Sequence, residues 1–362
     1  MEFGLSQEQT LLQDSVVQYL NGAAPLDRIK RFVNNCEPRA DDVWSGMVDL
    51  GIPSLIIAEE HGGIGCELLD AALVAESLGS CAAPVPFAAT AVMVPWAIAE
   101  AGSDEQQLRW LPKLAEGEVI AGAAVTEAIS TRLDAGVHAN GDTLSGRALF
   151  AIDFEADVYL IADRDLSLYL VDADASGLRR RPLTTIDKTR RYGELVFENV
   201  QADRLPGSSD PEVCRRVIDA GRIILAADTL GASQRMLNKA VNYSKERMQF
   251  GRPIGSFQAV KHMCAEMAAQ LEPCRAMMWY AAHAFDARPE EARLTICHTK
   301  SHLSEVGKFI ARTSTEVHGG IGFTDELGLH YWFKRIGANR QLLGGPTQLR
   351  EEAAMRQGLV EA

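Results

Sequence analysis

The chain has 362 residues, of which 47% are hydrophobic, and its formal net charge at pH 7 is −13. This length predicts two or three structural units, and the acidic balance argues against a broad nucleic-acid or membrane surface. The sequence contains no run of about eighteen apolar residues, so no membrane-spanning helix is predicted. The first residues lack the basic and apolar regions of a secretory signal. Seven cysteines without C-x-x-C spacing predict free thiols in a reducing cytoplasm, and no metal-ligand spacing is present.

Helical patterns fill the first third of the chain. Ser6, followed three residues later by Gln9, predicts a capping box at the start of the first helix. Gly51 predicts the end of a later helix. We therefore expect an all-helical domain over residues 1–118. The helical segments expected within it are residues 11–20, 44–50, 68–78, 88–101 and 110–114.

The pattern then changes to short apolar runs separated by turn signals. Asn140-Gly141 predicts a turn, and a hairpin is expected around Asp163-Arg164-Asp165. We expect a middle β domain over residues 119–208 and a C-terminal helical domain over residues 209–362. The strands expected in the middle domain are residues 119–125, 158–162, 168–171 and 195–200.

Residues 243–258 lie between two helical patterns, and the rest of the chain is organised around them. The apolar residues that recur at helical spacing in the second pattern are Val260, Cys264, Met267, Leu271, Cys274 and Met278. Gly251 and Pro253 cannot continue a helix, so a turn is expected that carries Arg247 and Phe250. A rigid turn with a fork-shaped cation and a flat aromatic suits an anionic, ring-bearing ligand. The alternative is a helical hairpin in which Phe250 only fills the joint.

Two motifs carry a family resemblance. The run R-x-Q-F-G-x-P-I-x-x-F-Q over residues 247–258 resembles a signature of the acyl-CoA dehydrogenase family, and His318-Gly-Gly-Ile-Gly-Phe-Thr324 resembles its second signature. The loop around residues 58–65 is similar to a third family segment, with Ala58 where proline is usual. The resemblance implies an α+β fold of the acyl-CoA dehydrogenase type: an N-terminal helical domain, a middle β-barrel or sheet domain and a C-terminal helical bundle.

The resemblance also implies an enzyme that uses FAD to oxidise an acyl-CoA thioester to its α,β-enoyl form. An electron-transfer flavoprotein or a similar acceptor would then take the electrons. In this family, some cofactor contacts cross a subunit interface, so one subunit completes the FAD site of its neighbour. The positions that match cofactor contacts are Arg247, Gln249, Phe250, Gln258, Glu316, Gly319, Gly320 and Thr126.

Three of these positions leave room for other interpretations. Gly319 and Gly320 suit a close approach of the backbone to a pyrophosphate, but a helix C-cap also favours glycine. Glu316 stands where the family usually has glutamine, and a carboxylate there would repel a pyrophosphate.

The positions that would lie beside the flavin ring depart further from the family. Thr126 and Glu127 are retained, but the glycine-rich loop that usually follows them is missing. Phe150 fills the expected aromatic position, whereas Ile152 replaces a threonine or serine. Because hydroxyl donors at the ring edge tune a flavin, their loss predicts a weakened ring site.

The family's catalytic base is a glutamate, and both positions known for it are glycine here. Gly344 occupies the usual position, and Gly221 occupies the alternative position before Arg222. The chain therefore has no predicted catalytic residue of its own. Asp219 and Glu326 are nearby carboxylates, and each is expected to be an exposed helix charge rather than a relocated base.

With these losses the chain resembles the non-catalytic partner subunit of the heterotetrameric α2β2 acyl-CoA dehydrogenases with which bacteria degrade steroid side chains. The main hypothesis is thus a cytoplasmic acyl-CoA dehydrogenase subunit that needs a second, base-bearing subunit. One alternative is a self-sufficient dehydrogenase with a relocated base such as Asp219. Another is a flavin-free scaffold or regulatory protein. The sequence does not indicate which acyl group the substrate would carry.

Overall fold

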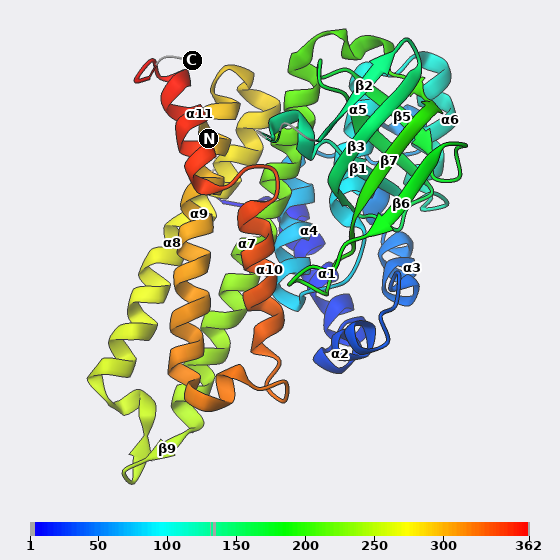
Figure 1. Cartoon of the computed structure of the whole chain (residues 1–362). Coiled ribbons are helices and arrows are strands. Elements are labelled where there is room, and N and C mark those ends of the chain that lie inside the picture. Colours follow the sequence, from blue (N-terminus) through cyan, green and yellow to red (C-terminus); the bar gives the residue numbers. More distant parts are fainter. Residues whose placement is uncertain (1–3, 131, 133–134, 361–362) are drawn as a thin grey trace. The chain divides into compact units, whose positions relative to one another are not determined.

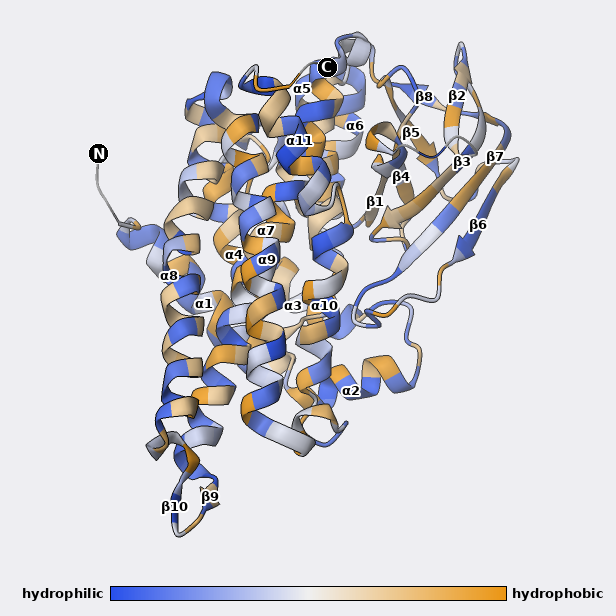
Figure 2. Ribbon diagram, turned by 60° about the vertical axis from the view of Figure 1, so that its left-hand side comes forward, coloured by the Kyte–Doolittle hydropathy of each residue, from blue (hydrophilic) through white to orange (hydrophobic). Residues whose placement is uncertain are grey.

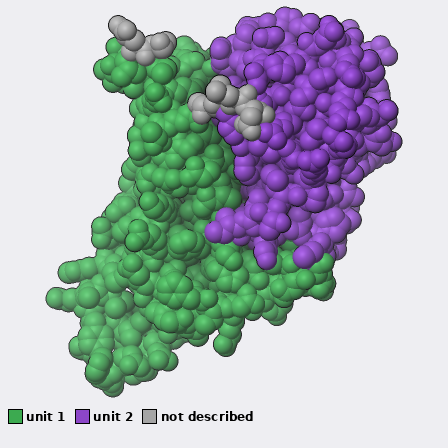
Figure 3. All heavy atoms as spheres, in the orientation of Figure 1, with its two compact units in different colours: residues 1–35, 72–83, 223–362 green, residues 36–71, 84–222 purple. Residues whose placement is uncertain are grey.

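The computed structural model describes residues 4–130, 132 and 135–360. The chain divides into two compact units, drawn in different colours in Figure 3. Unit 1 comprises residues 1–35, 72–83 and 223–362, and unit 2 comprises residues 36–71 and 84–222. The three-domain division expected from the sequence remains a prediction.

Helices form most of unit 1 and the first part of unit 2. The α-helices are α1 (Gln7–Ala23), α2 (Leu26–Asn34), α3 (Asp41–Asp49), α4 (Leu68–Cys81), α5 (Val94–Ala101), α6 (Asp104–Ala115), α7 (Pro211–Glu246), α8 (Gln258–Ala287), α9 (Pro289–His318), α10 (Leu329–Gln341) and α11 (Pro346–Arg356). A π-helical segment, η3 (Ala88–Met93), runs directly into α5.

The strands belong to two sheets. They are β1 (Ala121–Ala124), β2 (Gly136–Asn140), β3 (Thr143–Ile152), β4 (Val158–Ala162), β5 (Leu168–Asp172), β6 (Leu178–Pro182), β7 (Tyr192–Gln201), β8 (Asp203–Arg204), β9 (Met248–Gln249) and β10 (Arg252–Pro253). The strands β1 to β8 form one sheet in unit 2, and β9 and β10 form a small hairpin in unit 1.

Unit 1 is a bundle in which α8, α10 and α11 each pack against α9 (Figure 1). The buried face of α8 includes Met267, Leu271, Cys274 and Met278, which confirms the apolar spacing expected there, while Val260 and Cys264 at its start are only half-buried. Pro289 occupies the first turn of α9, where its missing N–H is tolerated. Periodic apolar residues and short connections therefore produce long antiparallel neighbours.

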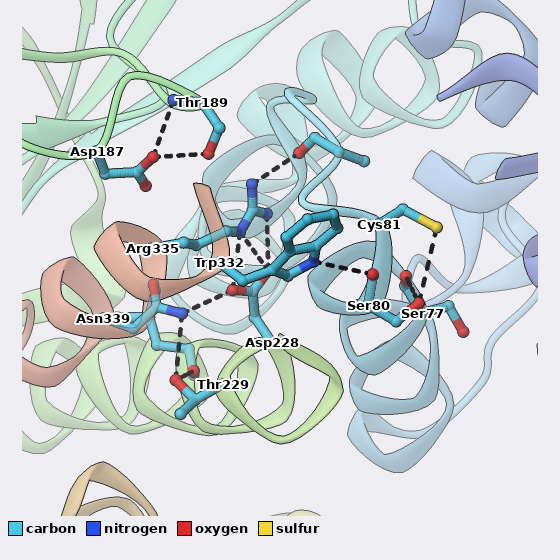
Figure 4. Close-up of polar contacts among 12 residues, drawn as sticks. Ser77, Ser80, Cys81, Asp187, Thr189, Asp228, Thr229, Trp332, Arg335 and Asn339 are labelled. Carbon is cyan, nitrogen blue, oxygen red and sulfur yellow. Dashed lines mark hydrogen bonds and ion pairs between the residues drawn. The ribbon is translucent and has the colours of Figure 1, made fainter. Parts of the chain in front are cut away.

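A buried polar network joins α7 to α10 and to the end of α4 (Figure 4). The Asp228 carboxylate accepts hydrogen bonds from Arg335 Nη2 at 2.7 Å and from Asn339 Nδ2 at 2.6 Å. Arg335 Nη1 also donates to the Ala83 carbonyl at 3.0 Å. Because Asp228 and Arg335 are both 1% exposed, the network fixes these helices through bonds that water cannot replace.

Unit 2 contains the sheet, whose strand order is β6-β7-β3-β1-β4-β5-β8, with β2 paired to β3. β1 and β4 are parallel, and the other pairs are antiparallel. The Asn140-Gly141 turn and the β4–β5 hairpin are both confirmed. The edge strand β6 is hydrophilic and largely exposed, which explains why apolar patterning did not reveal it (Figure 2).

The elements expected from the sequence are largely present. Ser6 and Gln9 form the capping box, Gly51 follows α3 in a left-handed conformation, and the seven cysteines are free. The order of helical segment, β sheet and helical bundle confirms the expected fold class. No helix in the described part of the chain combines the length and the apolar character that crossing a membrane would require.

Candidate cofactor site

The turn expected between the two long helical patterns is a β-hairpin that links α7 to α8. Phe250 and Gly251 form its tip with φ values of 52° and 75°. Two successive left-handed residues make the tight turn that matches the twist of paired strands. The Phe250 side chain is 91% exposed, so it does not fill the joint between the helices. Gln249 is exposed on β9, and Gln258 is exposed at the start of α8.

The two arginines of the hairpin differ in their surroundings. Arg252 places its guanidinium over the Phe257 ring, with Cζ 4.0 Å from the ring centroid. Arg247 is exposed, and its side chain has no ion-pair or hydrogen-bond partner among the described residues. Its backbone is nevertheless fixed, because its N–H donates to the Tyr243 carbonyl and its carbonyl accepts from the Ile254 N–H, both at 2.8 Å. Arg247 is therefore available to an external anion.

The second motif forms a glycine loop at the end of α9. Gly319 has a φ of 63° and a ψ of −143°, a conformation that disfavours other residues. A Cβ atom built on Gly319 or Gly320 would meet no atom within 4 Å, so the backbone is open to a ligand. Gly319 also caps α9, because its N–H reaches the Glu316 carbonyl. Glu316 itself is exposed in the last turn.

An aromatic stack between the half-buried Tyr243 and the buried His318 connects the end of α7, just before the hairpin, to the glycine loop. The rings of Tyr243 and His318 lie 4.7 Å apart with an interplanar angle of 30°. His318 Nδ1 donates to the Ser314 carbonyl at 2.7 Å, and the Ser314 hydroxyl donates to the Met236 carbonyl at 2.8 Å. Burial lowers the pKa of His318, and the nearby charge of Lys239 adds to this effect. The stack thus holds the helix end that precedes Arg247 beside the loop that begins at Gly319.

Thr126 lies in unit 2, in the 3-10 turn Thr126–Ile129 that follows β1. Its hydroxyl donates to the Phe150 carbonyl at 3.4 Å. The adjacent Glu127 carboxylate accepts from the Leu149 N–H at 3.2 Å and from Arg132. Residues 131, 133 and 134 lie outside the described residues, so part of the segment that replaces the glycine-rich loop has no structural description here.

A bulge in β3 shapes the same region. The pairing of β3 with β7 shifts between Ala148 and Ala151, and Phe150 within the bulge has a φ of 57°. Bulges re-aim side chains and are common beside functional sites. Ile152 follows the bulge, is 2% exposed and pairs with both neighbouring strands. It brings no hydrogen-bond donor to a position where the family has a hydroxyl.

Gly344 lies in a turn between α10 and α11. Its φ is 105°, and Leu343 before it has a φ of 54°. A residue with a Cβ atom would be strained at this φ. Lys300 on α9 is 2% exposed, and its Nζ donates to the carbonyls of Gly344 at 2.9 Å and Asn339 at 3.2 Å. At the usual position of the base, the backbone conformation therefore favours glycine, and a buried lysine fixes it by a hydrogen bond.

The expectation that Asp219 is an exposed helix charge is wrong. Asp219 is 2% exposed, and its Oδ1 accepts a hydrogen bond from Arg222 Nη1 at 3.0 Å within α7. A carboxylate that is buried and bonded in this way is poorly placed to reach a substrate carbon. Glu326 is exposed, as expected. Gly221 lies within α7 and offers no side chain.

The FAD that the resemblance implies can be tested against these residues. The unpartnered Arg247, the exposed Phe250 and the open glycine loop fit a pyrophosphate and its adenosine. The ring-side residues fit less well, because the Thr126 hydroxyl already donates to a carbonyl and Ile152 offers no donor. The arrangement therefore suits contacts to the phosphate end of a flavin cofactor better than contacts to its ring.

Comparison with known proteins places the chain in a family. Residues 6–118 match the acyl-CoA dehydrogenase N-terminal domain, and residues 212–359 match the acyl-CoA dehydrogenase C-terminal domain. The chain belongs to the acyl-CoA dehydrogenase family. It is 32% identical over 352 residues to acyl-CoA dehydrogenase IpdE2 of Mycobacterium tuberculosis, and the match covers 95% of each chain.

Similar solved structures include assemblies of two different chains. The ChsE4-ChsE5 complex from Mycobacterium tuberculosis contains a chain that superposes with a TM-score of 0.91 at 25% identity, covering 100% of both chains. The Tcur3481-Tcur3483 steroid acyl-CoA dehydrogenase variant gives a TM-score of 0.88 at 28% identity, covering 98% of each chain. The expected likeness to a heteromeric steroid acyl-CoA dehydrogenase subunit is thereby confirmed.

Sequence reasoning missed two residues that organise the site. Tyr243 stands at the edge of the first motif and carries no signal of its pairing with His318. Lys300 is an isolated lysine in a helical pattern, where an exposed position would be the ordinary expectation. Both act through contacts between helices that are distant in sequence.

Proposed function

We propose that this chain is a subunit of an FAD-dependent acyl-CoA dehydrogenase that completes a partner's cofactor site and supplies no catalytic base. The observation that carries the proposal is a contrast within the chain. Arg247 and Phe250, which would reach a neighbour's cofactor, are exposed, and the Arg247 side chain has no ion-pair or hydrogen-bond partner among the described residues. Both positions that would hold the base, Gly344 and Gly221, lack a side chain.

In this proposal, Arg247 donates hydrogen bonds to a cofactor phosphate, and Phe250 packs against the adenosine part. Gln249, Gln258 and Glu316 line the same contact. The backbone at Gly319 and Gly320 approaches the pyrophosphate, because glycine has no Cβ atom to hold the phosphate away. The Tyr243–His318 stack supports the arrangement because it fixes the distance between the two contributing segments.

Thr126 is proposed to contribute its hydroxyl on the ring side of a second, weaker cofactor site. Bound FAD would accept a hydride from the β carbon of an acyl-CoA thioester. Removal of the α proton needs a carboxylate close to that carbon, which we assign to the partner subunit. The proposed substrate class is a steroid side-chain CoA ester, by analogy with the heteromeric relatives. The proposed setting is cytoplasmic, with an electron-transfer flavoprotein or a similar acceptor.

The burial of Asp219 weighs against a self-sufficient enzyme with a relocated base. A flavin-free scaffold would need neither an unpaired Arg247 nor an open glycine loop. That alternative would still be supported if the chain and its partner purified together without any absorbance in the flavin band.

Co-expression of the chain with each base-bearing acyl-CoA dehydrogenase of the same genome tests the proposal. We expect one partner to yield a stable α2β2 complex that retains FAD and bleaches the flavin band when acyl-CoA is added. The chain alone should remain inactive when supplied with FAD. A stable, active monomer of this chain would rule the proposal out.

A further inference from the structure

An open pocket of about 460 Å³ lies on the surface of unit 1 between α8, α9 and α11. It is distinct from the cofactor site, because it lies beside the first half of α9 whereas the glycine loop follows the end of that helix. Sixteen residues of α9 between positions 302 and 318 correspond to about 24 Å. The pocket is lined by Met277, His298, Ser301, His302, Glu305 and Arg350.

The lining carries one carboxylate, Glu305, and one guanidinium, Arg350. Glu305 accepts a hydrogen bond from Arg340 Nη2 at 2.7 Å and lies 3.5 Å from Arg350 Nη2. The Arg340 hydrogen bond holds the pKa of Glu305 below its usual range, and the charges of Arg340, Lys308 and Arg350 act in the same direction. Arg340, outside the lining, already pairs with Glu305, so this carboxylate opposes an incoming anion less than an unpaired one would. The Arg350 guanidinium is the group in the lining that can attract an anion.

The two histidines add hydrogen-bonding groups on the same wall. His298 and His302 are four positions apart on α9, so they lie on one face of the helix, and both are exposed. Among the described residues, no group of three or more His, Cys, Asp or Glu side chains is arranged to hold a metal ion. His298 Nε2 lies 3.4 Å from Gln357 Nε2, and each imidazole can donate a hydrogen bond to an oxyanion through a ring N–H.

The pocket residue Glu305 contacts the elements on both sides of the turn that contains Gly344. Arg340 is in the last turn of α10 before it, and Arg350 is in α11 after it. Glu305 contacts both arginines, while Lys300, on the same helix, bonds the Gly344 carbonyl from the interior. The outer link is the weaker one, because the Arg350 side chain is 55% exposed and exposed ion pairs contribute little.

We propose that this pocket binds a small polyanion bearing phosphate or carboxylate groups through Arg350, His298 and His302. Binding draws Arg350 away from Glu305 and loosens the start of α11 together with the adjoining residues 342–345. Occupancy of the pocket thereby regulates the turn at Gly344. The inference does not depend on the proposed function, because its readouts are ligand binding and backbone exchange.

Calorimetric titration of the full chain with inorganic pyrophosphate, and separately with citrate, tests the site. We expect saturable binding of one ion per chain, with the tighter of the two probes identifying the preferred chemistry. His302→Ala and Arg350→Gln should each weaken binding about tenfold, as expected when a hydrogen-bonding or charged partner is lost. His283→Ala removes an exposed histidine of α8 outside the pocket and should bind as the unchanged chain does.

Hydrogen exchange tests the coupling. The amides of residues 342–345 should exchange faster when pyrophosphate is bound, and this response should disappear in His302→Ala. Absence of saturable binding, or equal binding by every variant, would overturn the site. Binding that occurs in the chain alone and vanishes in the assembled complex would overturn it too, because the pocket would then be a subunit contact. Binding without any change in exchange would overturn the regulatory role.

Discussion

The replacement of Arg247 by alanine gives the most direct test of the cofactor contacts. The Arg247 side chain is exposed and makes no ion pair or hydrogen bond with the described residues, so its removal should leave the folded chain intact. Its whole effect should therefore fall on ligand binding. A charge-assisted hydrogen bond to a phosphate contributes about 2–3 kcal/mol. This corresponds to a roughly 30- to 150-fold weaker affinity for FAD.

The hairpin offers a matched control. Arg252 lies on the same turn, but its guanidinium already stacks on Phe257 at 4.0 Å from the ring centroid. Arg252→Ala should therefore change FAD affinity much less than Arg247→Ala. Arg247→Lys should recover only part of the loss, because a lysine keeps the charge but not the planar fork.

The assay is the FAD content of the assembled complex after dialysis, measured by absorbance and complemented by a dissociation constant from titration. Thermal unfolding of the isolated chain accompanies it. FAD retention that is unchanged in Arg247→Ala would refute the assignment. A fall in the melting temperature of Arg247→Ala as large as that of a core substitution would show instead that this arginine stabilises the hairpin.

The remaining predictions concern catalysis, stability and pH. Substitution of the partner's catalytic glutamate should abolish all turnover of the complex. If about half of the turnover remained, a base would be present in this chain, and Asp219 would be the first residue to test. Asp228→Ala should destabilise the chain by about 3–5 kcal/mol, because the buried guanidinium of Arg335 loses its counter-charge. Denaturant unfolding measures this change in the free energy of unfolding, and a loss below about 1 kcal/mol would contradict the prediction. Burial lowers the pKa of His318 in the folded chain, so protonation of its ring opposes folding. The chain therefore keeps its full stability above the usual histidine pKa of about 6.5 and loses stability as the pH falls from there toward the lowered pKa. Unfolding free energies at successive pH values should therefore decline less steeply for His318→Gln, and an unchanged slope would contradict the assignment.

Local chemistry explains why much of the fold could be predicted. The capping box at Ser6, the end of α3 at Gly51 and the Asn140-Gly141 turn depend on residues a few positions apart. Apolar spacing likewise predicted the buried face of α8. The edge strand β6 was missed because it is polar and exposed, so it has no apolar pattern for sequence reasoning to detect.

The sequence by itself determined which groups are available for chemistry. Gly344 and Gly221 can supply no carboxylate in any conformation, and the two motifs identify the family before any contact is known. Side-chain identity is covalent, and the spacing within each motif is local. These features do not depend on how the helices pack.

Only the tertiary structure decided burial and the pairing of distant segments. Asp219 and Arg222 are neighbours on one helix, but packing around α7 is what removes them from water. Tyr243 and His318 lie on different helices, and Lys300 of α9 bonds the Gly344 carbonyl in the turn between α10 and α11. Such contacts depend on which helices meet and at what rotation, because the free energy of burial and of long-range hydrogen bonds arises only when those surfaces come together.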